Sequence, residues 1–197
     1  MMWGHGAPTD TRETHVSTTA TAIAAGTWDI DHAHSSVGFA VKHMGIATVR
    51  GEFNEFSGAL VVAEDGTMSA NATVQAASVD TKEQQRDDHL RSEDFFNAAA
   101  HPVFTLESTR VEMPDEDSMT VTGRLTINGV TNDITLKGDV LGQDVDPWGN
   151  ERVGIELRGK LSRADYKMRF NQALGSGNLL VADTVKIEID LSLVKQA

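Results

Sequence analysis

The chain has 197 residues, of which 40% are hydrophobic and 23% are charged, so it is long enough for one domain with a sizeable core. Its formal net charge of -12 repels nucleic acid phosphates and anionic lipid headgroups, so neither is expected as a partner of the surface. It contains no cysteine, which excludes disulfides, thiolate nucleophiles and cysteine-ligated metal sites. No apolar run approaches the roughly 20 residues of a spanning helix, so we expect no stable membrane insertion.

The first segment, residues 1–26, is rich in threonine and alanine and has no periodic apolar pattern. It lacks the basic start and the long apolar stretch of an export signal. We therefore expect a flexible leader over residues 1–26, a folded domain over residues 27–197 and a cytoplasmic location.

Alternation of apolar and polar residues dominates the rest of the chain and predicts strands with one apolar face. The first such strand carries Val37, Phe39 and Val41, and the last carries the longest alternating run, near residues 185–193. Short turn signals separate the strands, notably Asp65-Gly66 and Asn128-Gly129. About eight antiparallel strands with a continuous apolar face predict an all-β fold that closes into a barrel.

One stretch interrupts this pattern and predicts one or two short helices near residues 82–99. Thr81 and Gln84 have the spacing of a capping box, and Ser92 precedes two acids like a second N-cap. Pro102 marks the start of the next strand.

Four groups of residues, in order along the chain, resemble the motifs of one family. The first runs through residues 31–58, the second is "HLRSEDFF" at residues 89–96, the third is "GRLTINGVT" at residues 123–131, and the fourth comprises Arg163, Asp165, Tyr166 and the final strand. Together they make the chain, over residues 27–194, similar to the YceI-like family. Lys167 departs from the family pattern, which commonly has glycine after the aromatic residue.

The resemblance implies an extended, eight-stranded, lipocalin-like antiparallel barrel that holds a long polyisoprenoid chain in its lumen. Members often pair as homodimers and are often exported to the periplasm. The chain is thus expected to bind a long-chain isoprenoid, such as an isoprenoid quinone, or a similar amphipathic lipid, for carriage or storage. It is not expected to be an enzyme, and the bound lipid is the only expected cofactor.

We predict that the lipid contacts apolar residues of the inner face together with one histidine. This set comprises Val37, Phe39, Val41, His43, Phe53, Phe56, Phe104, Leu106, Leu125 and Ile127. Phe53 and Phe56 are three residues apart, so the alternation requires a bulge near Asn54-Glu55 to bring both to one face.

Three histidines in the stretch "DHAHSSVGFAVKHMG" raise the alternative of a metal site, since His32 and His34 share a face of a regular strand. His43 lies an odd number of residues from His34 and therefore on the other face, with Phe39 and Val41. A metal would need a further ligand, such as His89 or His101. No metal is expected, and His43 is either a satisfied structural histidine or a polar group near one end of the lumen.

Arg163 and Asp165 are two residues apart and would share one face of a strand. They would bind a polar headgroup or form an ion pair at the barrel end. Two other functions stay open: an acid–base enzyme acting on a small apolar substrate inside the barrel, and a structural protein without ligand.

Overall fold

The computed structural model describes residues 23–175, 177 and 179–197, and the predicted leader lies mostly outside these residues. Eleven antiparallel strands form one sheet. They are β1 (Gly26–Ile30), β2 (Ser36–His43), β3 (Ala47–Phe53), β4 (Phe56–Val62), β5 (Met68–Gln75), β6 (Val79–Asp80), β7 (Val103–Glu112), β8 (Ser118–Ile127), β9 (Val130–Val145), β10 (Glu151–Ser162) and β11 (Val181–Lys195). The helix α1 (Gln84–Arg91) and the 3-10 turns η1 (His32–His34), η2 (Ala76–Ser78) and η3 (Arg163–Tyr166) complete the described elements.

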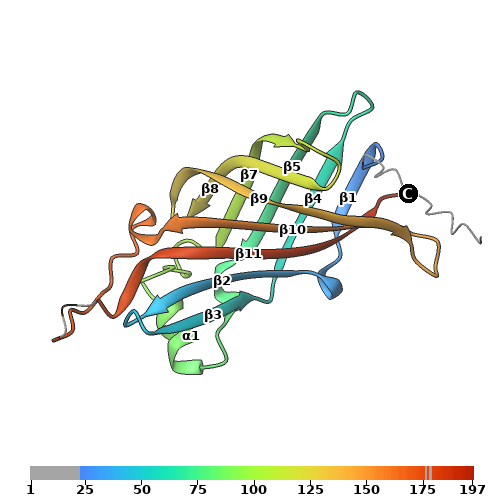
Figure 1. Cartoon of the computed structure of the whole chain (residues 1–197). Helices are drawn as coiled ribbons and strands as arrows, with labels where there is room; N and C mark the ends of the chain where they lie inside the picture. Colours follow the sequence, from blue (N-terminus) through green and yellow to red (C-terminus); the bar gives the residue numbers. More distant parts are fainter. Residues whose placement is uncertain (1–22, 176, 178) are drawn as a thin grey trace, which may run out of the picture.

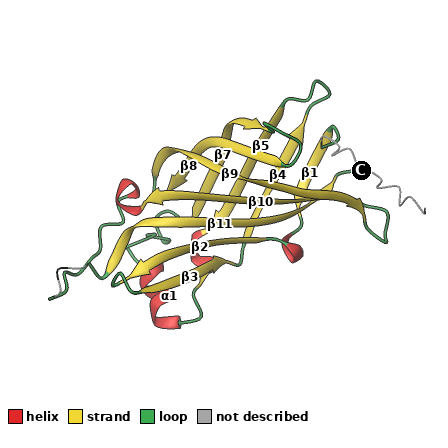
Figure 2. Cartoon of the chain, in the orientation of Figure 1, coloured by secondary structure: helices red, strands yellow, loops and turns green. Residues whose placement is uncertain are grey.

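Eight of the strands close a ring in the order β1-β4-β5-β7-β8-β9-β10-β11, because β11 pairs back onto β1. This closure confirms the predicted all-β antiparallel barrel of eight strands. Strands β2, β3 and β6 extend the sheet from the same edge of β11. Figures 1 and 2 show the resulting elongated barrel, with α1 at one end and the C-terminus at the other.

Strands β1 and β2 pair with different parts of the same edge of β11, and the sheet branches between them. Strand β1 pairs with β11 through Trp28, Asp29 and Ile30, and β2 pairs with the earlier part of β11. Beyond this edge β1 continues to β4 whereas β2 continues to β3. Two strand pairs, β1 with β4 and β2 with β3, therefore continue the sheet from one edge of β11.

The predicted bulge at Asn54-Glu55 is wrong, because these residues connect β3 to β4. Phe53 and Phe56 therefore belong to different strands and need not share a face. Phe53 is buried in an aromatic cluster, and Phe56 stacks on His32 with ring centroids 4.7 Å apart.

Of the one or two helices predicted near residues 82–99, one forms, and its cap differs from the prediction. Glu83 is the N-cap of α1 and accepts hydrogen bonds from the backbone of Gln85 and Arg86. Thr81 instead donates its amide and hydroxyl to Asp87 Oδ1, at 2.9 and 2.6 Å. Ser92 ends the helix as its C-cap, since its amide donates to the His89 carbonyl, and turns follow in place of a second helix.

The turn between β8 and β9 follows the sequence signal closely. Asn128 and Gly129 have φ values of 49° and 69°, the pair of positive angles that a two-residue hairpin turn requires. At the N-terminus, Ile23 is buried in the core although it falls within the predicted leader, and the indole of Trp28 donates to the Ala24 carbonyl. Within the described ranges, no helix has the length and apolar character needed to cross a bilayer.

Candidate functional site

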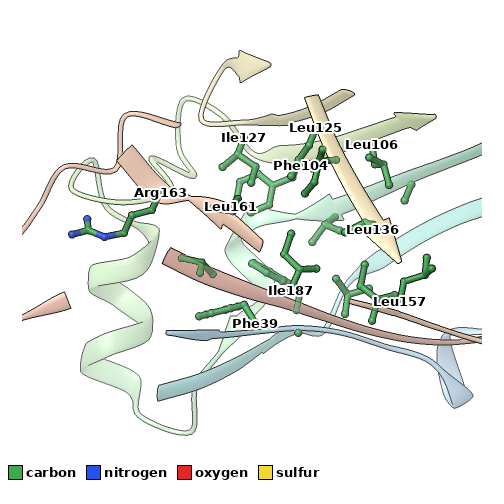
Figure 3. A pocket seen from close by; sticks show the side chains of 18 of the residues that line it. Phe39, Phe104, Leu106, Leu125, Ile127, Leu136, Leu157, Leu161, Arg163 and Ile187 are labelled. Atoms are coloured by element: carbon green, nitrogen blue, oxygen red, sulfur yellow. The ribbon is translucent and has the colours of Figure 1, made fainter. Parts of the chain in front are cut away.

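A cavity of ≈ 370 Å³ runs inside the barrel. This volume lies within the range of sites that hold small organic ligands. Its walls are apolar side chains from strands all around the ring, and Figure 3 shows Phe39, Leu106, Leu125, Leu157 and Ile187 directed towards a common space. The alternation that predicted the strands has therefore placed a continuous apolar lining around an unfilled interior.

Strand β2 supplies one wall, and its pairing explains how. Val37, Phe39 and Val41 lie opposite Ile189, Ile187 and Val185 of β11, and all six residues line the cavity. On the other side of β2, Gly51 of β3 gives the Phe39 ring its room. A Cβ at Gly51 would lie 2.4 Å from Cζ of Phe39, so a side chain there would displace the ring.

An aromatic cluster packs at the α1 end of this lining. Phe53 lies 5.7 Å from Phe39, 5.6 Å from Phe104 and 5.7 Å from Phe96, measured between ring centroids. These tilted and edge-to-face pairs are the arrangements that aromatic rings favour. They make this part of the wall stiff and set the width of the cavity beside it.

The structure brings nine of the ten predicted lipid-contacting residues to the cavity: Val37, Phe39, Val41, His43, Phe53, Phe104, Leu106, Leu125 and Ile127. Phe56 lies apart from them, against His32 and away from the lining. Its position follows from the connection at residues 54–55, because this connection joins β3, which pairs with β2, to β4, which pairs with β1.

The three histidines of the first motif separate, but not because of strand parity: His32 and His34 lie in the 3-10 turn η1 and not on the strand that carries His43. His43 ends β2 and lines the cavity. His34 lies outside, where its Nδ1 is 2.7 Å from Asp31 Oδ2, and His32 Nε2 is 2.7 Å from the Asn54 carbonyl oxygen. Over the described residues, no group of three or more His, Cys, Asp or Glu side chains is arranged to hold a metal ion.

Arg163 and Asp165 do not share a strand face, because both belong to the 3-10 turn η3. Asp165 is exposed, whereas Arg163 is 5% exposed. The Arg163 guanidinium donates to four backbone carbonyls, those of Met168, Phe170, Val181 and Ala182, at 2.6–3.3 Å. Burial lowers the pKa of this guanidinium.

Arg163 therefore does not form the expected ion pair. Its hydrogen bonds join the segment after η3 to the start of β11, and we call this arrangement the clamp. Figure 3 shows the guanidinium turned away from the apolar side chains of the cavity. Because most of its N–H groups are already bonded to carbonyls, the side chain holds the wall in place and leaves little donor capacity for a ligand.

The polar part of the lining has one sign of charge. Among the described residues that line the cavity, Lys42, Arg86 and Arg163 are basic and none is an Asp or a Glu, although the chain has 29 acids against 17 basic residues. His89 also lines the cavity, with Nε2 2.8 Å from Asp94 Oδ2. Because the Arg163 guanidinium is turned away, the cavity has an apolar body and a basic end formed by Lys42 and Arg86.

Sequence reasoning missed part of the site. Leu136, Ile155, Leu157, Leu161 and Leu180 line the cavity. The alternation in β9 and β10 could have identified several of them, because it marks the inner face of those strands. No local pattern could have identified His89 and Leu90 of α1, since a short polar helix does not reveal what it covers.

Comparisons with known proteins agree with the geometry. A family model described as YceI-like domain matches residues 28–193. Protein YceI of Escherichia coli O17:K52:H18 is 39% identical over 143 residues, which cover 72% of this chain and 74% of that protein.

Two solved structures have the same architecture. The Campylobacter jejuni YCEI protein is 31% identical, with a TM-score of 0.68 over 85% of this chain and 97% of that one. A polyisoprenoid binding domain from Saccharophagus degradans has a TM-score of 0.65 over 86% of this chain and 98% of that one, at 17% identity, which shows the fold alone. The matched family model spans nearly the whole barrel and the four motifs lie within it, so the chain belongs to the YceI-like family.

Proposed function

We propose that the protein binds the hydrocarbon chain of a long-chain isoprenoid, or of a similar amphipathic lipid, inside the barrel. The observation that carries this proposal is the apolar cavity of ≈ 370 Å³. A close-packed core leaves few voids larger than a water molecule, so a cavity of this size is typical of a protein that binds a ligand in its interior. The polyisoprenoid binding domain with the same fold supports the choice of cargo.

The hydrophobic effect alone does not drive transfer of a lipid from a membrane into this cavity. Removing a methylene from water gains about 0.8 kcal/mol, but an isoprenoid chain in a membrane is already in hydrocarbon. Its transfer into an apolar lumen therefore gains little. Selectivity must come from the shape of the cavity and from the polar groups at its basic end. We propose that these groups, including His43, lie near the polar head of the cargo.

We propose a binding protein and not an enzyme. Acid–base catalysis requires a donor or acceptor poised against a polar substrate group. The lining formed by the described residues is apolar over most of its area, and its candidate proton donors or acceptors are His43 and His89, the second of which is already bonded to Asp94.

The test measures lipid carried by the purified protein, using mass spectrometry of the intact protein and of its lipid extract. We expect a co-purified long-chain lipid in the wild type and its loss in Val41→Trp, which fills the cavity. Val61→Trp is the matched control, because Val61 is an exposed residue of β4. It should keep the lipid.

Clean lipid-free protein from several hosts, with no binding of added isoprenoid quinones, would contradict the proposal. So would a Val41→Trp variant that keeps its lipid but loses stability. Overpacking a solid core costs about 1–3 kcal/mol, and that result would mean that the cavity is core space.

A further inference from the structure

The cavity opens at the α1 end of the barrel. Lys42 is exposed there, and the neighbouring lining residues His43, Phe170 and Leu180 are half-buried. At the opposite end Trp28 and Leu193 are fully buried and close the barrel. A ligand that enters along the barrel axis therefore passes the α1 end.

Two segments far apart in sequence form one side of this opening. The turn between β2 and β3 is tied to the segment before β11, since the Met44 amide donates to the Leu180 carbonyl at 2.9 Å and His43 pairs with Val181. Figure 1 shows both segments at the α1 end. We call the five exposed residues Lys42, Ile46, Lys167, Arg169 and Leu179 the rim.

The rim exposes apolar side chains that nothing in the described chain covers. Ile46 is 80% exposed and Leu179 is 52% exposed. They project from two adjoining segments and do not form a broad flat face. A stable protein interface buries about 800 Å² on each partner, which two separate side chains do not supply. Binding to a bilayer surface needs less apolar area, because burial of a few apolar side chains adds to the attraction between basic side chains and anionic lipid.

The charge of the rim is opposite to that of the whole protein. Residues 32–51 and 166–182 contain no Asp or Glu, in a chain with 29 acids. In the part of the chain that the structure describes, no carboxylate pairs with Lys42, Lys167 or Arg169. Asp88 and Asp94 of the α1 region are paired with Arg91 and His89, and the exposed Asp165 and Asp183 lie just outside residues 166–182.

We propose that the rim docks on an anionic lipid surface, with Ile46 and Leu179 in the interface and Lys42, Lys167 and Arg169 against the phosphates. The net charge of -12 then repels the rest of the protein from the same surface, so that the barrel approaches with its open end towards the membrane. Docking in this orientation gives a cargo a path between bilayer and cavity that avoids water. This surface goes beyond the proposed cargo site and is tested without any isoprenoid.

The first experiment measures co-sedimentation with vesicles of phosphatidylcholine alone and of phosphatidylcholine with phosphatidylglycerol, at low and high salt. We expect binding to the anionic vesicles that weakens as salt rises, because the rim charges are exposed. The double variant Ile46→Ser, Leu179→Ser should bind at least about tenfold more weakly, since it loses two apolar contacts with the interface.

The matched control is the double variant Leu141→Ser, Trp148→Ser, which removes exposed apolar side chains from the β9–β10 hairpin at the other end (Figure 1). It should bind like the wild type. For the charges, Arg169→Gln should weaken binding about fivefold, the effect expected of one basic residue near an anionic surface. Lys137→Gln, an equal charge change on the exposed face of β9, should not weaken binding.

Several outcomes would overturn the docking surface. These are no binding to anionic vesicles at low salt, equal binding to both kinds of vesicle, or equal loss in the rim variant and the hairpin variant. Lipid content of the same proteins separates the two proposals. Vesicle binding without co-purified lipid contradicts the cargo alone, and co-purified lipid without vesicle binding contradicts the rim alone.

Discussion

The guanidinium of Arg152 on β10 reaches the carboxylate of Asp31, with Nη1 2.6 Å from Oδ2. Asp31 is the N-cap of η1 and stands where β1 and β2 diverge along β11. The Nε of Arg152 also lies 2.8 Å from Asp146 Oδ2 in the β9–β10 hairpin. One arginine therefore joins the hairpin to the point at which the barrel wall divides.

This ion pair predicts how stability depends on pH. Hydrogen bonds from Arg152 and then from His34 lower the pKa of Asp31 to about 2, from a usual value of 3.8. Because the folded-state pKa is the lower one, the stabilisation is complete above pH 3.8 and is lost as pH falls towards 2. We expect Arg152→Gln to lower the free energy of unfolding at pH 7 by about 1–2 kcal/mol, given partial solvent exposure.

Urea unfolding between pH 7 and pH 2 checks this, with a carboxyl titration of Asp31 by NMR. The difference between wild type and Arg152→Gln should shrink as the pH falls from about 4 to 2. Arg124→Gln, an exposed arginine of β8, is the control and should change stability little. A difference that is the same at every pH would show that the Arg152 side chain acts by packing alone.

The clamp at Arg163 predicts a large effect of a conservative change. Arg163→Lys keeps the charge but cannot bond four carbonyls at once. We expect it to lower the free energy of unfolding by about 2–4 kcal/mol, because buried carbonyls lose their donors. Amide exchange of the chain between η3 and β11 should accelerate more than that of β8. Arg50→Lys, in an exposed ion pair with Glu188, should cost less than about 0.5 kcal/mol.

Lys167 occupies a backbone conformation that suits glycine. It follows η3 with φ 63° and ψ 8°, in the left-handed region. We therefore expect Lys167→Gly to raise the free energy of unfolding by about 0.5–1 kcal/mol, since relief of strain exceeds the entropy that glycine loses on folding. Lys160→Gly in the extended strand β10 should lower it by a similar amount. Thermal unfolding should show that Lys167→Gly stabilises the protein and Lys160→Gly destabilises it. If both variants are less stable than the wild type, the backbone at Lys167 is not strained.

Ile23 predicts that the packed core reaches beyond the domain start expected at residue 27. It is 5% exposed and packs in the core cluster that contains Trp28 and Leu60. Ile23→Ala should cost about 2–4 kcal/mol of unfolding free energy, whereas Ile46→Ala, at an exposed site, should cost less than about 0.5 kcal/mol. A cost for Ile46→Ala as large as that for Ile23→Ala would contradict the assignment of Ile23 to the core.

Most of the long strands, their antiparallel pairing and their inner faces could be predicted from the sequence alone. Alternation in the strand of Val37, Phe39 and Val41 is a local property, because successive side chains of any strand point to opposite sides. The Asn128-Gly129 turn is equally local, since its two residues tolerate positive φ. Parity does not account for the separation of His43 from His34, because His34 lies in η1, before the strand of His43 begins.

Only the tertiary structure decided which edges meet and what the interior holds. The return of β11 to β1, the divergence of β1 from β2 and the outward position of Phe56 depend on pairings between residues far apart in the chain. The role of Arg163 depends on carbonyls that tertiary packing brings to it. A cavity is likewise a property of packing, because whether apolar side chains fill a barrel or only line it depends on strand number and tilt and on the summed side-chain volumes.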